Sequence, residues 1–197
     1  MNERAFFIDR DGVVNRMTRY AGKWDSPQNP EDVRLVEGIV LLLGWLNSHG
    51  IMTVEISNRP EVAKGKMNRV TSDAIEARVH ALLAEQGVQV DHKYICIHYP
   101  EGLVPELALE CECRKPKPGL LLQAARELNI DLAGSVFLGD KASDVGAGKA
   151  AGVITILYQH TDDELQKVEG VKKADANYKV NSLRDILPVI KGVFRQV

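Results

Sequence analysis

The chain has 197 residues, of which 45% are hydrophobic and 26% are charged, values typical of one folded globular domain rather than a disordered protein. The formal charge of −2 gives no support to a surface for nucleic acid or an anionic membrane. No stretch reaches the roughly 18 consecutive apolar residues of a membrane span, and the N-terminus carries no signal-peptide pattern. We therefore expect a monomeric cytoplasmic protein with a single domain over residues 1–197 and neither nucleic-acid nor membrane partners.

The first predicted strand ends in a pair of carboxylates. Residues 5–8 form a continuous apolar run, as in a strand that is buried on both faces. Asp9 and Asp11 follow two positions apart, so in an extended chain both side chains point the same way, and Gly12 permits a sharp turn. Two such close carboxylates repel unless a metal cation holds both ionised or one takes a proton. We expect a site at this strand end, with an Asp-Gly turn and a chance second aspartate as the alternative.

The segment after this strand is predicted to be irregular. Residues 13–36 are mostly polar, and Pro27 and Pro30 exclude a long helix. Residues 16–24 combine basic and aromatic side chains close in sequence to the two carboxylates. They form either a mobile flap over the site or a plain surface loop.

Strands and helices then alternate along the chain, which predicts βαβ units and a parallel sheet with helices on both faces. The expected strands cover 51–56, 94–97, 135–138, 153–157 and, at an edge, 176–180. The expected helices cover 37–49, 67–86, a segment from Pro118, a small-residue segment up to Gly152, and a final helix from about 181 that Pro188 kinks or shortens. The fold class is therefore α/β, a Rossmann-like three-layer sandwich without a large cap domain.

All three cysteines lie in one short segment. Cys96 and His98 stand at one end of a loop, and Cys111 and Cys113 stand at the other. An odd number of cysteines argues against a disulfide framework. This Cys₃His combination matches a four-coordinate structural zinc site, which leaves no open position for catalysis. We expect Zn²⁺ to tether the loop 96–113; the alternative is three reduced cysteines and a solvated histidine.

Polar and charged residues also follow other predicted strands. They are Ser57 and Asn58 after the second strand, Arg114 and Lys115 after the second thiol pair, and Asp140, Lys141 and Asp144 after the fourth strand. Hydroxyl, backbone N–H and ammonium groups at strand ends can hold phosphate oxygens. The alternatives are an ordinary Ser-Asn turn, an exposed basic turn and an N-cap aspartate.

Taken in chain order, these groups resemble the four motifs of the haloacid dehalogenase-like phosphatases, from about residue 6 to residue 152. The matching segments are Asp9-Arg10-Asp11-Gly12, Ser57-Asn58, Lys115, and Gly139-Asp140-Lys141 with Asp144. The thiol loop is similar to that of the subgroup that contains histidinol-phosphate and heptose-bisphosphate phosphatases. Its length, and the Cys113-Arg114-Lys115-Pro116 segment, favour the heptose-bisphosphate branch.

The resemblance implies a Mg²⁺-dependent phosphomonoesterase that acts on a small phosphorylated sugar, with a heptose 1,7-bisphosphate as the expected substrate. It implies that Asp9 is the nucleophile, that Asp11 is the acid and base, and that Lys115 holds the transferred phosphoryl group. The implied magnesium ligands are the Asp9 carboxylate, the Asp11 backbone carbonyl and Asp140. The implied substrate-binding residues are Ser57, Asn58, Arg59, Arg114 and Lys141.

Two departures from the subgroup concern the sugar. These heptose phosphatases typically have Thr-Asn-Gln-Ser-Gly where this chain has Ser57-Asn58-Arg59-Pro60-Glu61, and the segment 16–24 also differs from their pattern. A histidinol-phosphate or other sugar phosphatase therefore stays open. So does a non-catalytic binding module of the same fold. A receiver domain would be shorter and would not explain the thiol loop.

Overall fold

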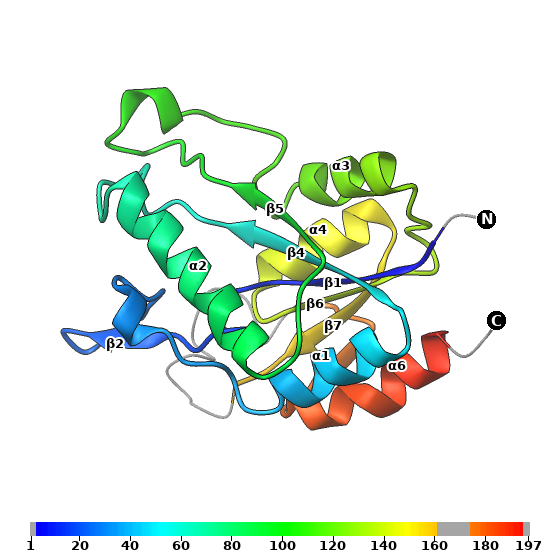
Figure 1. Ribbon diagram of the computed structural model, residues 1–197. Coiled ribbons are helices and arrows are strands. Elements are labelled where there is room, and N and C mark those ends of the chain that lie inside the picture. Colours follow the sequence, from blue (N-terminus) through cyan, green and yellow to red (C-terminus); the bar gives the residue numbers. More distant parts are fainter. Residues whose placement is uncertain (1–2, 161–173, 195–197) are drawn as a thin grey trace.

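The computed structural model describes residues 3–160 and 174–194 (Figure 1). Within these ranges, six parallel strands form one sheet in the order β5-β4-β1-β6-β7-β8. The strands are β1 (Ala5–Ile8), β4 (Met52–Asn58), β5 (His92–Cys96), β6 (Val136–Gly139), β7 (Ile154–Tyr158) and β8 (Tyr178–Val180). The helices are α1 (Ile39–Ser48), α2 (Arg69–Glu85), α3 (Gly119–Leu128), α4 (Ala142–Ala151) and α6 (Ile186–Phe194).

The central strand β1 is buried on both faces, as its apolar run predicts. Alternate side chains enter different hydrophobic cores because successive residues of a strand point to opposite faces. Phe6 and Ile8 pack with residues of α1, α2 and α6, whereas Ala5 and Phe7 pack with residues of α3 and α4. Figure 1 shows these two helical layers on either side of the sheet. The predicted three-layer α/β architecture is confirmed.

The strand order places the first and fourth motifs next to each other. From β1 the chain proceeds to β4 and β5 on one side, and β6, β7 and β8 lie on the other side. The order therefore reverses between β1 and β6, and ligands of open α/β sheets bind at such a switch point. Asp9 directly follows β1 and Asp140 directly follows β6. In Figure 1 the carboxyl ends of the central strands and the short strand β2 (Thr18–Tyr20) lie on the same side of the molecule.

The prediction of irregular structure for residues 13–36 is wrong for the stretch 18–25. β2 (Thr18–Tyr20) and β3 (Lys23–Asp25) pair as an antiparallel hairpin. Ala21 and Gly22 both have positive φ angles, 47° and 82°, which suits the right-handed twist of a two-residue hairpin. Strands of three residues, with an alanine at the first turn position, give no recognisable sequence pattern.

The final helix begins later than predicted. A 3₁₀ turn covers Leu183–Asp185, and α6 starts at Ile186. Pro188 therefore lies in the first turn of α6, where its missing N–H breaks no helical hydrogen bond. Over the described part of the chain, none of the helices combines the length and apolar character needed to cross a membrane.

Candidate active site

Asp9 lies at the end of β1 with one ammonium group against each of its carboxylate oxygens. Lys115 Nζ donates to Oδ1 at 2.8 Å, and Lys141 Nζ is 3.5 Å from Oδ2. Burial acts to raise the pKa of Asp9, but Lys115 and Lys141 outweigh it and the pKa is lowered. This buried side chain, 4% exposed, is therefore held as a carboxylate.

Lys115 is fixed by both its side chain and its backbone. Its ammonium also contacts the Ile56 carbonyl oxygen at 2.7 Å and Asp144 Oδ1 at 2.7 Å. Burial would lower the pKa of Lys115, but Asp144 and Asp9 raise it, so the ammonium stays charged. The Asn58 side chain accepts from the Lys115 N–H at 3.0 Å and donates to the Lys115 carbonyl at 3.1 Å. Asn58 thus joins the Lys115 loop to the end of β4.

Asp140 lies against the turn that follows β1. Gly12 has a φ of +100°, and a Cβ built on it would come within 2.0 Å of Asp140 Oδ2. Only glycine permits this close approach. His160 Nε2 is 3.0 Å from the same oxygen. Asp140 does not cap α4, because Asp144 accepts a hydrogen bond from the Lys141 N–H at 2.9 Å, so the N-cap alternative for Asp140 does not hold.

The Lys141 ammonium lies among the three oxygens that the resemblance assigns to magnesium. It is 3.0 Å from the Asp11 carbonyl oxygen, 3.3 Å from Asp140 Oδ1 and 3.5 Å from Asp9 Oδ2. Carboxylate and carbonyl oxygens are the ligands that Mg²⁺ prefers. Oxygens of Asp9, Asp140 and Asp144 also lie within 4.8 Å of one another. The residues present therefore fit a divalent cation, and a cationic group already occupies their centre.

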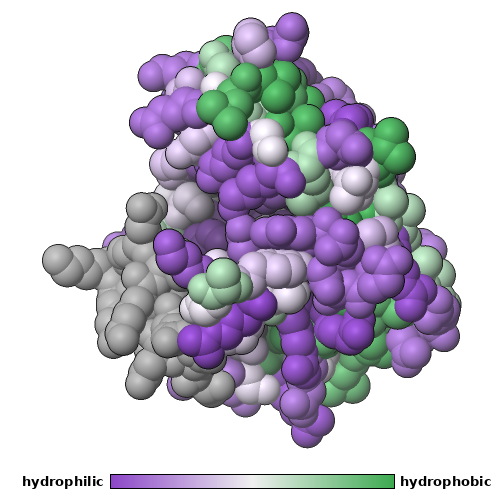
Figure 2. All heavy atoms as spheres, turned by 90° about the vertical axis from the view of Figure 1, so that its left-hand side faces the viewer, coloured by the Kyte–Doolittle hydropathy of each residue, from purple (hydrophilic) through white to green (hydrophobic). Residues whose placement is uncertain are grey.

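The Asp11 carboxylate is surrounded by donors. Arg10 contacts both oxygens through Nη2 at 3.0 Å, and Asn15 Nδ2 donates to Oδ1 at 3.0 Å. Arg59 Nη1 approaches Oδ2 at 3.6 Å. Asp11 lines a small cavity of about 40 Å³ together with Asp9, Ser26, Asn58, Lys115, Lys141, Ser143 and Asp144. Figure 2 faces this edge of the sheet, whose surface is largely hydrophilic.

The remaining predicted substrate-binding residues divide into two groups. Ser57 and Arg59 are buried, 1% and 2% exposed, and neither is among the residues that line the small cavity. The Ser57 hydroxyl has no hydrogen-bond partner among the described residues. Arg114 lies outside the cavity lining, with its guanidinium 5.0 Å from the centre of the Tyr99 ring, and Lys64 Nζ is 4.2 Å from the same centre.

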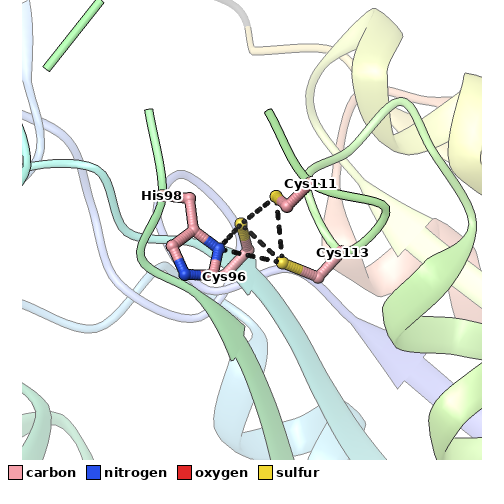
Figure 3. A group of neighbouring side chains, drawn as sticks. All are labelled: Cys96, His98, Cys111 and Cys113. Carbon is pink, nitrogen blue, oxygen red and sulfur yellow. Dashed lines mark hydrogen bonds between the residues drawn. The ribbon is translucent and has the colours of Figure 1, made fainter. Parts of the chain in front are cut away.

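The three thiols and His98 converge on one point (Figure 3). The Cys113 sulfur is 3.1 Å from the sulfurs of Cys96 and Cys111 and 3.4 Å from His98 Nδ1. The Cys96 sulfur is 3.5 Å from that of Cys111 and 4.0 Å from His98 Nδ1. Tetrahedral ligands at zinc–sulfur distances of about 2.3 Å would be roughly 3.8 Å apart. The donor set and its spacing therefore fit the predicted Zn²⁺.

Sequence reasoning missed several contributors to this region. Asn15 and His160 contact Asp11 and Asp140, but each stands in a segment without a motif. Lys64 reaches Tyr99 only through the fold. Glu61 follows Arg59 by two residues and pairs with it. The occurrence of Glu61 two residues after Arg59 is the one sequence feature that could have indicated this ion pair.

Comparisons with known proteins identify the family of this chain. A family model described as HAD-hydrolase-like matches residues 112–186. The D-glycero-beta-D-manno-heptose-1,7-bisphosphate 7-phosphatase of Yersinia pestis is 35% identical over 191 residues, which cover 97% of both chains. The enzyme of the same name from Escherichia coli K12 is 33% identical over 187 residues, covering 95% of this chain and 93% of that one.

Solved structures give the same result. The D,D-heptose 1,7-bisphosphate phosphatase from B. bronchiseptica, solved in complex with magnesium and phosphate, is similar with a TM-score of 0.79 and 25% identity. The similarity covers 96% of this chain and 98% of that one. The chain therefore belongs to the haloacid dehalogenase-like phosphatases, in the family of the heptose-bisphosphate phosphatases.

Proposed function

We propose that this protein is a Mg²⁺-dependent phosphomonoesterase that removes the 7-phosphate of D-glycero-D-manno-heptose 1,7-bisphosphate through an aspartyl-phosphate. The observation that carries the proposal is the ionised, buried Asp9 carboxylate between Lys115 and Lys141. A carboxylate nucleophile needs such cations, because an anionic phosphate must approach it. The substrate rests on the family, since the named relatives act on this heptose bisphosphate.

The chain's own residues divide the reaction into two steps. Asp9 attacks phosphorus and the bond to the sugar oxygen breaks, while Asp11 gives that oxygen a proton. Water then attacks the phosphorus of the aspartyl-phosphate and passes a proton to Asp11, which releases phosphate and restores both aspartates. Lys115, with a hydrogen bond to Asp9, holds the transferred phosphoryl oxygens. The Ser57 hydroxyl, which has no hydrogen-bond partner within residues 3–160 and 174–194, and the Asn58 backbone N–H are proposed as further donors at the end of β4.

Asp9, the Asp11 carbonyl and Asp140 would hold the Mg²⁺ ion. Bound there, it would neutralise charge on the phosphoryl group. The Lys141 ammonium contacts the same oxygens, so it and the metal compete for them. We assign Lys141 to the substrate phosphate once the metal is bound.

Arg114 and Lys64 are proposed to contact the second phosphate or the sugar. Both cations flank the Tyr99 ring. Burial, together with the neighbouring charges of Lys66 and Arg114, lowers the pKa of Lys64. An anion bound between these cations would relieve their mutual repulsion.

Zinc at Cys96, His98, Cys111 and Cys113 is proposed to be structural. Four protein ligands leave no position for substrate or water. Arg114 and Lys115 directly follow Cys113, so the metal would fix the backbone that carries them. The cytoplasmic location, the monomeric state and the lack of nucleic-acid and membrane partners stay predictions.

A phosphatase screen tests the proposal. Phosphate release is measured with and without Mg²⁺ from heptose 1,7-bisphosphate, histidinol phosphate, a hexose bisphosphate and p-nitrophenyl phosphate. We expect metal-dependent turnover with the heptose bisphosphate as the best substrate. Preference for histidinol phosphate would replace the substrate but keep the reaction. No metal-dependent release from any of these esters would favour a non-catalytic binding module.

A further inference from the structure

Arg59 and Glu61 form a buried ion pair next to Asp11. Both residues lie in the segment that directly follows β4. Arg59 Nε is 3.1 Å from Glu61 Oε2, and the two side chains are 2% and 8% exposed. Two buried charges of opposite sign therefore lie together beside the Asp11 carboxylate. A buried ion pair alone is weak evidence for added stability, so its position requires another explanation.

The Arg59 guanidinium connects Glu61 to Asp11. Nη1 lies 3.6 Å from Asp11 Oδ2. Nη1 and Nη2 have no hydrogen-bond partner among the described residues. A buried guanidinium with free donors is costly unless carboxylates lie nearby. Glu61 contacts Nε of the guanidinium, and the terminal nitrogens Nη1 and Nη2 are left for Asp11.

The two oxygens of Asp11 differ in their surroundings. Oδ1 receives Arg10 Nε at 3.3 Å, Arg10 Nη2 at 3.0 Å and Asn15 Nδ2 at 3.0 Å. Oδ2 receives Arg10 Nη2 at 3.0 Å and has Arg59 at the longer distance of 3.6 Å. Oδ1 is thus saturated with donors, and Oδ2 is the oxygen with capacity left to carry a proton.

We propose that Arg59, held by Glu61, is a positioning residue that orients the Asp11 carboxylate for proton transfer to the leaving oxygen. The inference rests on the proposed function, because proton donation by Asp11 is part of it. It replaces direct substrate contact as the role of Arg59, because the Arg59 guanidinium lies against the carboxylates of Glu61 and Asp11.

The consequence is a dependence on the leaving group. A sugar alkoxide is a poor leaving group and needs the proton from Asp11, whereas p-nitrophenolate leaves without one. Loss of orientation at Asp11 therefore slows cleavage of an alkyl ester more than cleavage of the aryl ester. A general loss of folding or of substrate binding would slow both alike.

The experiment compares Arg59→Gln with the parent and with Arg69→Gln, an exposed arginine paired with Asp73 on α2. The alkyl ester is the heptose 1,7-bisphosphate, or the hexose bisphosphate if only that is turned over. For the aryl ester, the first step is read as the burst of p-nitrophenolate after rapid mixing. We expect the alkyl-to-aryl rate ratio to fall at least about 10-fold in Arg59→Gln, to fall less in Arg59→Lys, and to stay unchanged in Arg69→Gln.

The double variant Arg59→Gln/Glu61→Gly separates orientation from stability. Arg59→Gln alone leaves Glu61 buried without its partner and should lower the thermal midpoint. Removing Glu61 as well should restore the midpoint while the rate ratio stays low. A ratio that recovers together with the midpoint would show a structural role, and a higher KM for both esters would show substrate contact; either result overturns the proposal.

An active parent whose ratio is unchanged by Arg59→Gln overturns this inference only. A parent without metal-dependent turnover overturns the proposed function and this inference with it.

Discussion

Two clusters of side chains differ in how the chain brings their members together. The carboxylate–lysine cluster contains Asp9, Lys115, Asp140, Lys141 and Asp144, and the thiol–histidine cluster, called the thiol cluster below, contains Cys96, His98, Cys111 and Cys113. Asp9 and Lys115 are 106 positions apart in the chain, and their charges are buried and compensate one another. The thiol cluster joins two local pairs of ligands, and the members of each pair are two residues apart in the sequence. The first cluster should therefore matter mainly for the reaction, and the second mainly for the stability of the loop that carries Lys115.

The largest expected effect concerns the nucleophile. Asp9→Asn keeps the size of the side chain but removes its charge, so kcat should fall at least about 10⁴-fold. Zinc content should equal that of the parent, because the thiol cluster is untouched. Steady-state kinetics and metal analysis on the same sample check both points. An Asp9→Asn variant with more than a few per cent of parental turnover would refute the assignment.

The thiol cluster should show the opposite behaviour. Cys111→Ser removes one zinc ligand, and we expect zinc to be lost and the thermal midpoint to fall by about 10 °C, which corresponds to roughly 4 kcal/mol. Leu109→Ala, at an exposed position in the same loop, serves as the matched control. Calorimetry and metal analysis provide the measurement. Equal midpoints and zinc contents in parent and variant would mean that these residues do not hold a structural metal.

The buried carboxyl group of Glu55 should make the free energy of unfolding depend on pH. Glu55 is fully buried, and burial raises its pKa from 4.5 to about 7 despite the attraction of Arg10. The folded state then binds more protons than the unfolded state between these values, so stability falls as pH rises through this window. Glu55→Gln should match the parent near pH 4.5 and exceed it above pH 7, by up to about 3 kcal/mol. Denaturant unfolding at both pH values tests this; an equal difference at both would contradict it.

The smallest expected effect concerns the cation within the first cluster. Lys141→Gln removes an ammonium that contacts the proposed magnesium oxygens, so Mg²⁺ should bind about 10-fold more tightly, or ~1.4 kcal/mol. Titration calorimetry measures this without turnover. Lys149→Gln, an exposed position at the end of α4, should leave the affinity unchanged. Weaker Mg²⁺ binding by Lys141→Gln would show that the lysine does not compete with the metal.

The two clusters also differed in how well the sequence predicted them. The thiol pairs were identified from spacing alone, because each pair is local. The carboxylate–lysine cluster required the family resemblance, since its members come from separate strand ends. Neither route predicted that Lys141 lies among the proposed magnesium oxygens or that Arg59 is buried against Asp11. Those contacts depend on tertiary packing, as do the β2–β3 hairpin and the late start of α6.

The most direct test of the account is chemical trapping of the phosphorylated protein. The parent is mixed with Mg²⁺ and substrate, quenched in acid within one turnover, and its peptides are analysed by mass spectrometry. We predict one added phosphoryl group on the peptide that contains Asp9, released by hydroxylamine and absent from Asp9→Asn. A phosphoryl group on another residue, or none at any quench time in a turning-over enzyme, would contradict the account.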